Sequence, residues 1–252
     1  MIQSRVIPCL LLRNGGLVKT VKFRDAKYVG DPINAVRILN DKEVDELVFL
    51  DIGATPSAKG PNFDLLADIA GEAFMPFGYG GGITTVDQVN RLFALGVEKA
   101  IINTAAANDP GLIEQAAAIA GSSSVVVAID ARRGLLGRYR VHVRAGQTDT
   151  GRDPVSYARE MESLGAGELF VQAIDREGTL SGYDLDLIHQ VAQAVSIPVV
   201  ASGGAGSLRH FREAVDAGAS AAAAGSYFVF HGKHRAVLIT YPEPHELREL
   251  FQ

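Results

Sequence analysis

The sequence contains a single cysteine, no tryptophan and no long hydrophobic run. One cysteine, Cys9, cannot form an internal disulfide, so we expect a protein of a reducing compartment, the cytoplasm. Cys9 lies in the apolar run from Val6 to Leu12 and is interpreted as a buried structural thiol rather than a nucleophile. No apolar stretch approaches the roughly 18–20 residues that span a bilayer, and no basic segment precedes an apolar one at the N-terminus. These absences predict a soluble protein without a membrane partner.

The chain also lacks an excess of positive charge. It carries 24 Lys and Arg residues against 29 Asp and Glu residues, a formal net charge of -5, which argues against a nucleic acid as its partner. The six histidines show no metal-ligand spacing, so no metal and no other cofactor is expected. His231 and His234 lie beside or within the basic stretch 232–235, which we interpret as a solvated loop.

Short apolar runs alternate regularly with amphipathic stretches along the 252 residues, a length typical of one (β/α)8 barrel. Most of the runs are continuously apolar, as expected for parallel strands covered by helices. The pattern predicts an α/β fold, a single (β/α)8 TIM barrel over residues 1–252, with a doubly wound open sheet as the alternative. The expected strands are 5–11, 46–51, 75–79, 99–103, 124–130, 168–173, 198–201 and 221–224, and the expected helices are 32–40, 63–72, 86–95, 111–120, 155–163, 185–195, 208–216 and 244–251.

An internal repeat favours the closed barrel over the open sheet. Gly82 and Thr104 are 22 positions apart in the first half, and Gly204 and Ser226 are 22 positions apart in the second half. Leu11 in the first half corresponds to Asp130 in the second. We therefore expect two half-barrels, about 1–122 and 123–252, with no linker between them.

Glycines gather where the expected strands end, in two clusters related by the repeat. Glycine lets the backbone come close to an anion, and a following helix offers free N–H groups. Each cluster alone could serve only tight turns, but its recurrence at matched spacing indicates phosphate binding. The sequence thus predicts a ligand with two phosphates, or with one at each end of a long molecule. The first cluster is Gly80–Gly82 with Asn103 and Thr104, and the second is Gly178, Thr179, Gly203, Gly204, Gly225 and Ser226.

Further polar residues mark the two ends of the expected strands. The carboxyl ends, where such barrels place their chemistry, carry Asp51, Asn103, Asp130, Gln172, Asp175 and Ser202. Asp130 follows a strongly apolar strand and is the candidate general acid or base. For Asp51 and Asp175 we favour carboxylates held by backbone amides and basic side chains. The strand starts carry Arg5, Glu46, Lys99 and Glu168, which could close the bottom of the barrel as a charged ring or serve only as stabilising ion pairs.

These motifs resemble the HisF family, the cyclase subunits of imidazole glycerol phosphate synthase, over nearly the whole chain. The resemblance implies that a HisH-type glutaminase docks at the barrel bottom. Its ammonia would pass through the core to a ribulosyl aminoimidazole carboxamide nucleotide that bears two phosphates. The matching stretches are 5–10, 30–32, 45–51, 80–83, 102–106, 127–131, 164–168, 178–179, 182–184 and 201–206.

The resemblance also assigns roles to single residues. The family's ammonia gate falls on Arg5, Glu46, Lys99 and Glu168. Its phosphate contacts fall on Gly82, Asn103, Thr104, Gly178, Gly204, Gly225 and Ser226, and Lys19 matches in the flexible loop after the first strand. Asp51, Gln172 and Ser202 complete the substrate-binding residues that we expect.

Departures from the family pattern point to a changed activity. Asp130 keeps one acid of the family's catalytic pair, but Leu11 stands where the other aspartate is expected. A leucine cannot transfer a proton, and loss of a positioned acid or base costs about 10²–10⁴-fold in rate. Gln172 stands where a small hydroxyl residue is usual, and Glu177 replaces an aspartate.

The stretches 10–12, 15–23 and 232–236 are similar to the glycosyl amidation-associated WbuZ-type branch of the HisF-like proteins. That similarity implies a barrel that accepts ammonia from a HisH-like glutaminase and supports a separate sugar amidotransferase of surface-polysaccharide synthesis. Our leading hypothesis is such a subunit with lost or altered cyclase chemistry. The alternatives are an active cyclase subunit of histidine biosynthesis and a non-catalytic scaffold that binds a phosphosugar.

Overall fold

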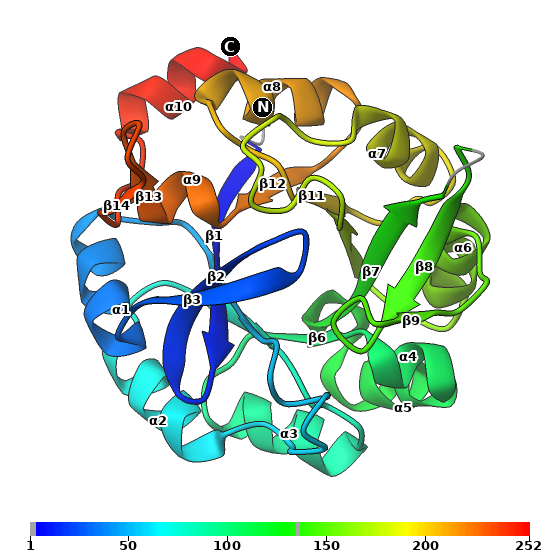
Figure 1. Cartoon of the computed structure of the whole chain (residues 1–252). Coiled ribbons are helices and arrows are strands. Elements are labelled where there is room, and N and C mark those ends of the chain that lie inside the picture. Colours follow the sequence, from blue (N-terminus) through cyan, green and yellow to red (C-terminus); the bar gives the residue numbers. More distant parts are fainter. Residues whose placement is uncertain (1–3, 135–136) are drawn as a thin grey trace.

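Eight parallel strands close into a barrel in the computed structural model, which describes residues 4–134 and 137–252 (Figure 1). Each strand pairs with its neighbours, and the pairings of β12 with β1 and of β7 with β10 complete the ring. The (β/α)8 prediction is confirmed, and the open-sheet alternative is wrong. The barrel strands are β1 (Arg5–Arg13), β4 (Leu47–Asp51), β5 (Phe77–Gly80), β6 (Lys99–Ile102), β7 (Val125–Arg133), β10 (Glu168–Ala173), β11 (Val199–Ser202) and β12 (Ala221–Ala224).

Helices surround the strands on the outside (Figure 1). Local chemistry starts several of them: Asp31 and Asp153 each accept a hydrogen bond from a first-turn N–H, and Thr85 forms a capping box with Gln88. Each helix lies close to the range expected from its amphipathic pattern. They are α1 (Pro32–Asp41), α2 (Phe63–Glu72), α3 (Val86–Ala94), α5 (Gly111–Ala120), α6 (Pro154–Ser163), α7 (Leu185–Ala192), α8 (Leu208–Asp216) and α10 (Pro244–Phe251).

The strands are buried on both faces, which explains their continuous apolar runs. One set of strand residues packs against the helices, and another set fills the barrel interior; Ile7, Cys9, Val48 and Phe170 belong to the interior set. Burial raises the pKa of the Cys9 thiol to about 12, so it stays protonated at neutral pH. Cys9 is thus buried as predicted.

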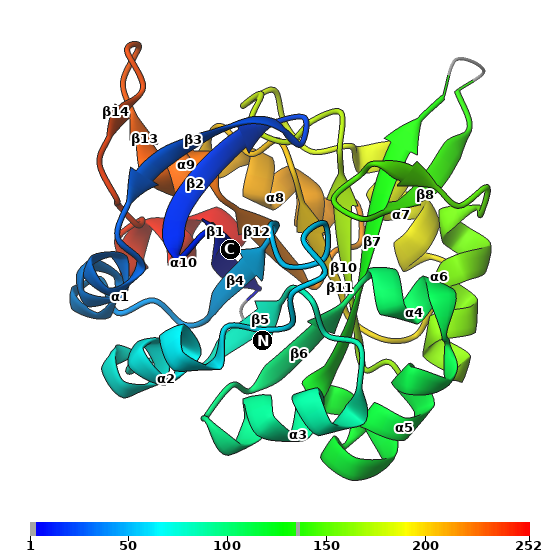
Figure 2. The same cartoon turned by 60° about the horizontal axis from the view of Figure 1, so that its bottom comes forward.

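Two hairpins extend the barrel on the side where the strands end, and neither was predicted from the sequence. β1 continues to Arg13 and folds back as β2 (Gly16–Val21), which pairs with β3 (Arg24–Gly30). β7 continues to Arg133 and pairs with β8 (Tyr139–Val143), which pairs with β9 (Thr148–Asp149). Figure 1 shows β2 and β3 lying across the mouth of the barrel, and Figure 2 shows both hairpins on one side of it.

Smaller differences concern element ends. The strand expected from Met75 begins at Phe77, after Pro76, whose carbonyl accepts a hydrogen bond from Leu47 N. Pro110 is the N-cap of α5, and no side chain caps this helix. The short elements α4 (Thr104–Asn108), η1 (Ser122–Ser124), α9 (Ser226–Val229), β13 (Phe230–His231) and β14 (Ala236–Val237) were not expected.

Two absences hold for the residues that the structure describes. In that part of the chain, no helix is long and apolar enough to cross a membrane. The same residues hold no group of three or more His, Cys, Asp or Glu side chains that could bind a metal ion.

Candidate functional site

A ring of four alternating charges closes one end of the barrel. The two terminal nitrogens of Arg5 donate to Glu46 and Glu168, and Lys99 Nζ lies 2.9 Å from Glu46 Oε1 and 2.8 Å from Glu168 Oε2. Each carboxylate is therefore held by both cations. The carboxylates are buried, with side chains 8% and 6% exposed, whereas the cations are 31% and 21% exposed. The structure thus brings together all four residues that the sequence placed at strand starts.

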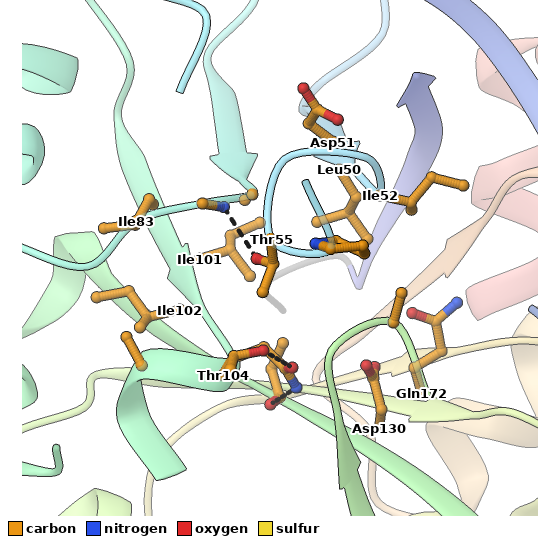
Figure 3. A pocket seen from close by; sticks show the side chains of 18 of the residues that line it. Leu50, Asp51, Ile52, Thr55, Ile83, Ile101, Ile102, Thr104, Asp130 and Gln172 are labelled. Carbon is orange, nitrogen blue, oxygen red and sulfur yellow. Dashed lines mark hydrogen bonds between the residues drawn. The ribbon is translucent and has the colours of Figure 1, made fainter. Parts of the chain in front are cut away.

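The opposite end of the barrel contains a cavity of about 170 Å³, bordered mainly by the first half of the chain (Figure 3). Gly81, Gly82, Asn103 and Thr104 line one part of it. Asp130 and Gln172 line another part and lie side by side in the close-up. The wall between them is mostly hydrocarbon, from Leu11, Leu50, Ile52, Ile101, Ile102 and Ala128.

Asp130 is the acid that faces this cavity. It is 8% exposed, and none of the hydrogen bonds among the described residues reaches its carboxyl group. Burial, and to a lesser degree the charge of Glu177, raises the pKa of Asp130 to about 7. A carboxyl group with that pKa can donate or accept a proton near neutral pH. Leu11 lines the same cavity from β1 and is 4% exposed, so the repeat-related position offers hydrocarbon instead of a second acid.

The first glycine cluster shapes the cavity through close backbone packing. Gly82 has a φ of +67°, and a Cβ there would lie 2.4 Å from the carbonyl oxygen of Lys59, so only glycine fits. Gly82 N donates to Thr55 Oγ1 over 3.3 Å. Thr104 Oγ1 accepts a hydrogen bond from Arg144 N at 3.0 Å and lies 3.2 Å from Asn103 Oδ1. The predicted set of Gly82, Asn103 and Thr104 is thus gathered at one cavity.

The two strand-end carboxylates of the repeat are engaged with the backbone, as favoured from the sequence. Asp51 Oδ1 accepts hydrogen bonds from Gly53 N at 2.9 Å and Ala54 N at 3.1 Å. Asp175 accepts a hydrogen bond from Arg133 N at 3.0 Å and lies 3.8 Å from Arg132 Nε. Asp51 also borders the cavity, but in Figure 3 its carboxylate points away from the centre.

The second glycine cluster lies beneath the β2–β3 hairpin. Lys19 was expected in a flexible loop, and that expectation is wrong: it lies in β2, is 4% exposed, and its Nζ lies 3.2 Å from Glu177 Oε1. The hairpin ladder fixes this segment and points the ammonium inward. Lys19 Nζ would lie 2.0 Å from a Cβ on Gly225. Ser202 is buried at the end of β11 and Ser226 is buried at the start of α9, just after β12; Gly178 and Gly204 lie in the loops beside them.

Several cavity residues escaped the sequence analysis because they come from the unexpected hairpins. Phe23 and Ala145 line the cavity from the β2–β3 and β8–β9 turns. These turns touch, since a Cβ on Gly146 would lie 2.8 Å from the Phe23 ring. One signal was present: Asn14-Gly15 between apolar runs is a typical two-residue hairpin turn, and both residues have positive φ, 52° and 78°.

Comparison with known proteins agrees with this architecture. A family model described as "Histidine biosynthesis protein" matches residues 5–235. A Pseudomonas aeruginosa protein named "Putative imidazole glycerol phosphate synthase subunit hisF2" is 52% identical over 248 residues, which cover 98% of this chain and 99% of that protein. The "Putative imidazole glycerol phosphate synthase subunit HisF" of Leptospira borgpetersenii is 46% identical over the full length of both chains. The "Imidazole glycerol phosphate synthase subunit HisF" of Alkaliphilus metalliredigens is 44% identical over 92% of each chain. By its sequence and its closed barrel, this chain belongs to the HisF family of histidine biosynthesis proteins.

Proposed function

We propose that this chain is the barrel subunit of a glutamine-dependent ammonia-transfer complex whose own cyclase chemistry has been lost or altered. A HisH-like glutaminase would dock at the end that carries the charged ring, and ammonia would cross the barrel to the opposite end. The observation that carries the proposal is the complete ring of Arg5, Glu46, Lys99 and Glu168 at one end, combined with Leu11 facing the Asp130 cavity at the other.

The charges and the burial of the ring support a role as a gate. Its carboxylates are buried, while its cations are partly exposed, so the cations are the groups with room to swing aside. Behind the ring, the interior is lined by apolar residues such as Ile7, Val48 and Phe170. Such a lining disfavours ammonium because burial of an unpaired charge is costly, whereas neutral ammonia carries no such penalty. The arrangement therefore suits passage of ammonia.

The cavity at the opposite end of the barrel has one group that can transfer a proton where the family has two, which supports the proposed loss or change of cyclase chemistry. Asp130 can exchange a proton near neutral pH because its pKa is raised to about 7. Leu11 supplies no second group, and the missing acid or base corresponds to about 10²–10⁴-fold in rate. We therefore propose that the nitrogen is used by a separate amidotransferase acting on a surface-polysaccharide sugar, with support from the WbuZ-like stretches 10–12, 15–23 and 232–236.

The pairing can be tested by mixing the purified chain with a HisH-type glutaminase from the same organism. We expect a one-to-one complex in sedimentation analysis and its weakening when Arg5→Ala disrupts the ring. A control, Arg209→Ala, removes an exposed arginine of α8 that pairs with Glu213 four residues away, and it should leave the complex intact. The absence of any complex would contradict the proposal; phosphate binding in that case would favour a phosphosugar-binding scaffold.

An active cyclase is the second candidate, and the raised pKa of Asp130 favours it. Asp130 would then work together with water molecules in place of the missing acid. Ammonia-dependent formation of imidazole glycerol phosphate from the bisphosphate nucleotide would establish this activity. If the chain forms no product above background but still binds the glutaminase, the active cyclase is rejected and the ammonia-transfer subunit remains.

A further inference from the structure

We infer that three hairpins around the mouth of the barrel form a docking surface for a second protein with an acidic face, the enzyme that consumes the ammonia. The hairpins are β2–β3, β7–β9 and β13–β14, which project from the same side of the barrel (Figure 2). Arg235, between β13 and β14, donates to Gly178 O in the loop after β10, so this hairpin also contacts the mouth. We call the three hairpins the mouth surface. The identity of the partner rests on the proposed function.

Positive charge is concentrated on the mouth surface. The segments 13–30, 131–152 and 230–237 contain 13 of the chain's 24 Lys and Arg residues but only 2 of its 29 Asp and Glu residues, Asp25 and Asp149. These segments carry a formal net charge of +11 and the rest of the chain carries -16, which together give the overall -5. The overall charge therefore conceals two regions of opposite sign. A surface of one sign steers a partner of the opposite sign and fixes its orientation.

Most of these cations are available to a partner. Arg132 lies 3.8 Å from Asp175 Oδ1, and Lys19 is buried beside Glu177. Eight others are exposed and form no ion pair among the described residues. Most of the eight are arginines, whose planar guanidinium groups match carboxylates with two parallel hydrogen bonds. The eight are Arg13, Lys22, Arg24, Lys27, Arg138, Arg144, Lys233 and Arg235.

These cations surround the 170 Å³ cavity without lining it. Among the residues that the structure describes, the lining of that cavity includes no Lys or Arg. A small ligand inside the cavity therefore leaves the exposed cations unmatched. Because they lie on three hairpins that are far apart in the sequence, only a broad acidic partner can meet all of them.

The mouth surface is hollowed beside the first hairpin. A cavity of about 670 Å³ lies between the β2–β3 hairpin and the loop after β4. Arg13, Arg24 and Lys59 line it, together with Asp25 and with Asp51, whose carboxylate already accepts two backbone hydrogen bonds. An acidic loop of a protein can fill such a recess, whereas the surface of a membrane cannot follow it. The shape therefore favours a protein over an anionic membrane.

Exposed apolar side chains accompany the positive charge. Tyr28 in β3 is 71% exposed, yet its ring lies against Gly16 in β2, where a Cβ would come within 2.8 Å of it. Val237 and Leu238, beside the β13–β14 hairpin, are 50% and 55% exposed. Tyrosine and arginine are enriched at protein interfaces, and a ring that is already held loses little entropy on binding. Tyr28 is thus suited to anchor a protein partner.

The position of the mouth surface suits the proposed function. Ammonia that crosses the barrel leaves it at the mouth, where bulk water would dilute and protonate it. A protein seated on the three hairpins would cover the mouth and receive the ammonia directly. The partner is therefore the enzyme that uses the nitrogen.

Calorimetric titration of the purified full chain with the sugar amidotransferase of the same organism, in the absence of the glutaminase, tests this inference. We expect a one-to-one complex whose affinity falls about tenfold or more when sodium chloride is raised from about 50 to about 300 mM. Lys27→Gln, Arg138→Gln and Lys233→Gln combined remove one cation from each hairpin. One exposed ion pair corresponds to about 1.4- to 5-fold in affinity, so this triple variant should bind about 3- to 100-fold more weakly.

The matched control removes the same charge from the outer helices. Lys42 directly follows α1, and Arg159 and Arg248 are exposed on α6 and α10. Lys42→Gln, Arg159→Gln and Arg248→Gln combined should change the affinity by less than about twofold. Thermal melting of both triple variants establishes that they are folded.

Three results would overturn the inference: a folded wild type that does not bind the amidotransferase, two triple variants that bind it equally well, or vesicles of phosphatidylglycerol and phosphatidylcholine that bind the wild type but not the hairpin variant. The effect of the wild type on glutaminase turnover is measured separately. Stimulation of the glutaminase together with any of these results would reject the mouth surface and leave the proposed ammonia transfer intact. Binding of the amidotransferase through the hairpins without that stimulation would support the mouth surface and contradict the ammonia transfer.

Discussion

Replacement of Lys99 by methionine tests the charged ring most quantitatively. Lys99 is one of two cations that hold both Glu46 and Glu168, at 2.9 and 2.8 Å, and it is 21% exposed. Methionine keeps the length of the aliphatic chain but removes the charge, so two buried carboxylates would depend on Arg5 alone. Loss of one partner from a fully buried ion pair costs about 3–5 kcal/mol. Because Arg5 remains and Lys99 is partly exposed, we expect a lower value, about 2–3 kcal/mol.

The expected loss is measurable in a chain of this size. One kcal/mol shifts the melting temperature of a 150–250-residue protein by about 2–4 °C, so Lys99→Met should melt about 4–12 °C lower than the wild type. Lys99→Met combined with Glu46→Gln removes one carboxylate together with its cation and should recover part of the loss. Calorimetry of the wild type, both single variants and the double variant gives the coupling energy. A Lys99→Met variant that melts within 1 °C of the wild type, or strictly additive effects, would refute the ring as a coupled unit.

Three further predictions address the other end of the barrel. Asp130 has a pKa raised to about 7 in the folded chain and about 3.9 when unfolded, so the folded state binds more protons between these values and wild-type stability falls as the pH rises from about 4 to 7. The free energy of unfolding of Asp130→Asn, relative to that of the wild type, should therefore increase by up to about 4 kcal/mol from pH 4 to pH 8. A difference in melting temperature between the two proteins that is the same at both pH values would argue against the burial of a charged Asp130. Leu11→Asp returns a carboxyl group to the cavity that Asp130 faces and should raise ammonia-dependent cyclase product by about 10²-fold or more over the wild type; product that stays at background would show that position 11 alone does not silence the chemistry. Gly82→Ala should cost more than about 2 kcal/mol, since a Cβ would lie 2.4 Å from Lys59 O, whereas Gly15→Ala, in the Asn14-Gly15 turn with a φ of +78° and no atom within 4 Å of the added Cβ, should cost only about 1 kcal/mol of backbone strain. Equal losses in denaturant unfolding would show that the close approach at Gly82 is unimportant.

The barrel could be predicted from the sequence because its signals are local. Strands such as β7 are buried on both faces and are continuously apolar, and helices such as α1 and α6 begin at Asp-Pro caps. The β2–β3 hairpin was missed because β3 is mostly exposed and carries charged residues. The Asn14-Gly15 turn was its one local signal.

The placement of the site was only partly predictable. The four ring residues lie at or directly before the starts of different strands, and parallel strands in a closed barrel bring their starts to one rim. The repeat likewise predicted that Gly82, Asn103 and Thr104 lie together, and all three line one cavity. The environment of Lys19 could not be foreseen, because its partner Glu177 lies 158 positions away.

The proposed ammonia transfer is tested most directly by the turnover of a HisH-type glutaminase with and without this chain. We predict that the wild-type barrel raises glutamine hydrolysis by the glutaminase, and that Lys99→Met at saturating concentration changes that stimulation while Thr104→Ala does not. A glutaminase whose turnover is the same with and without the wild-type chain would contradict the proposal.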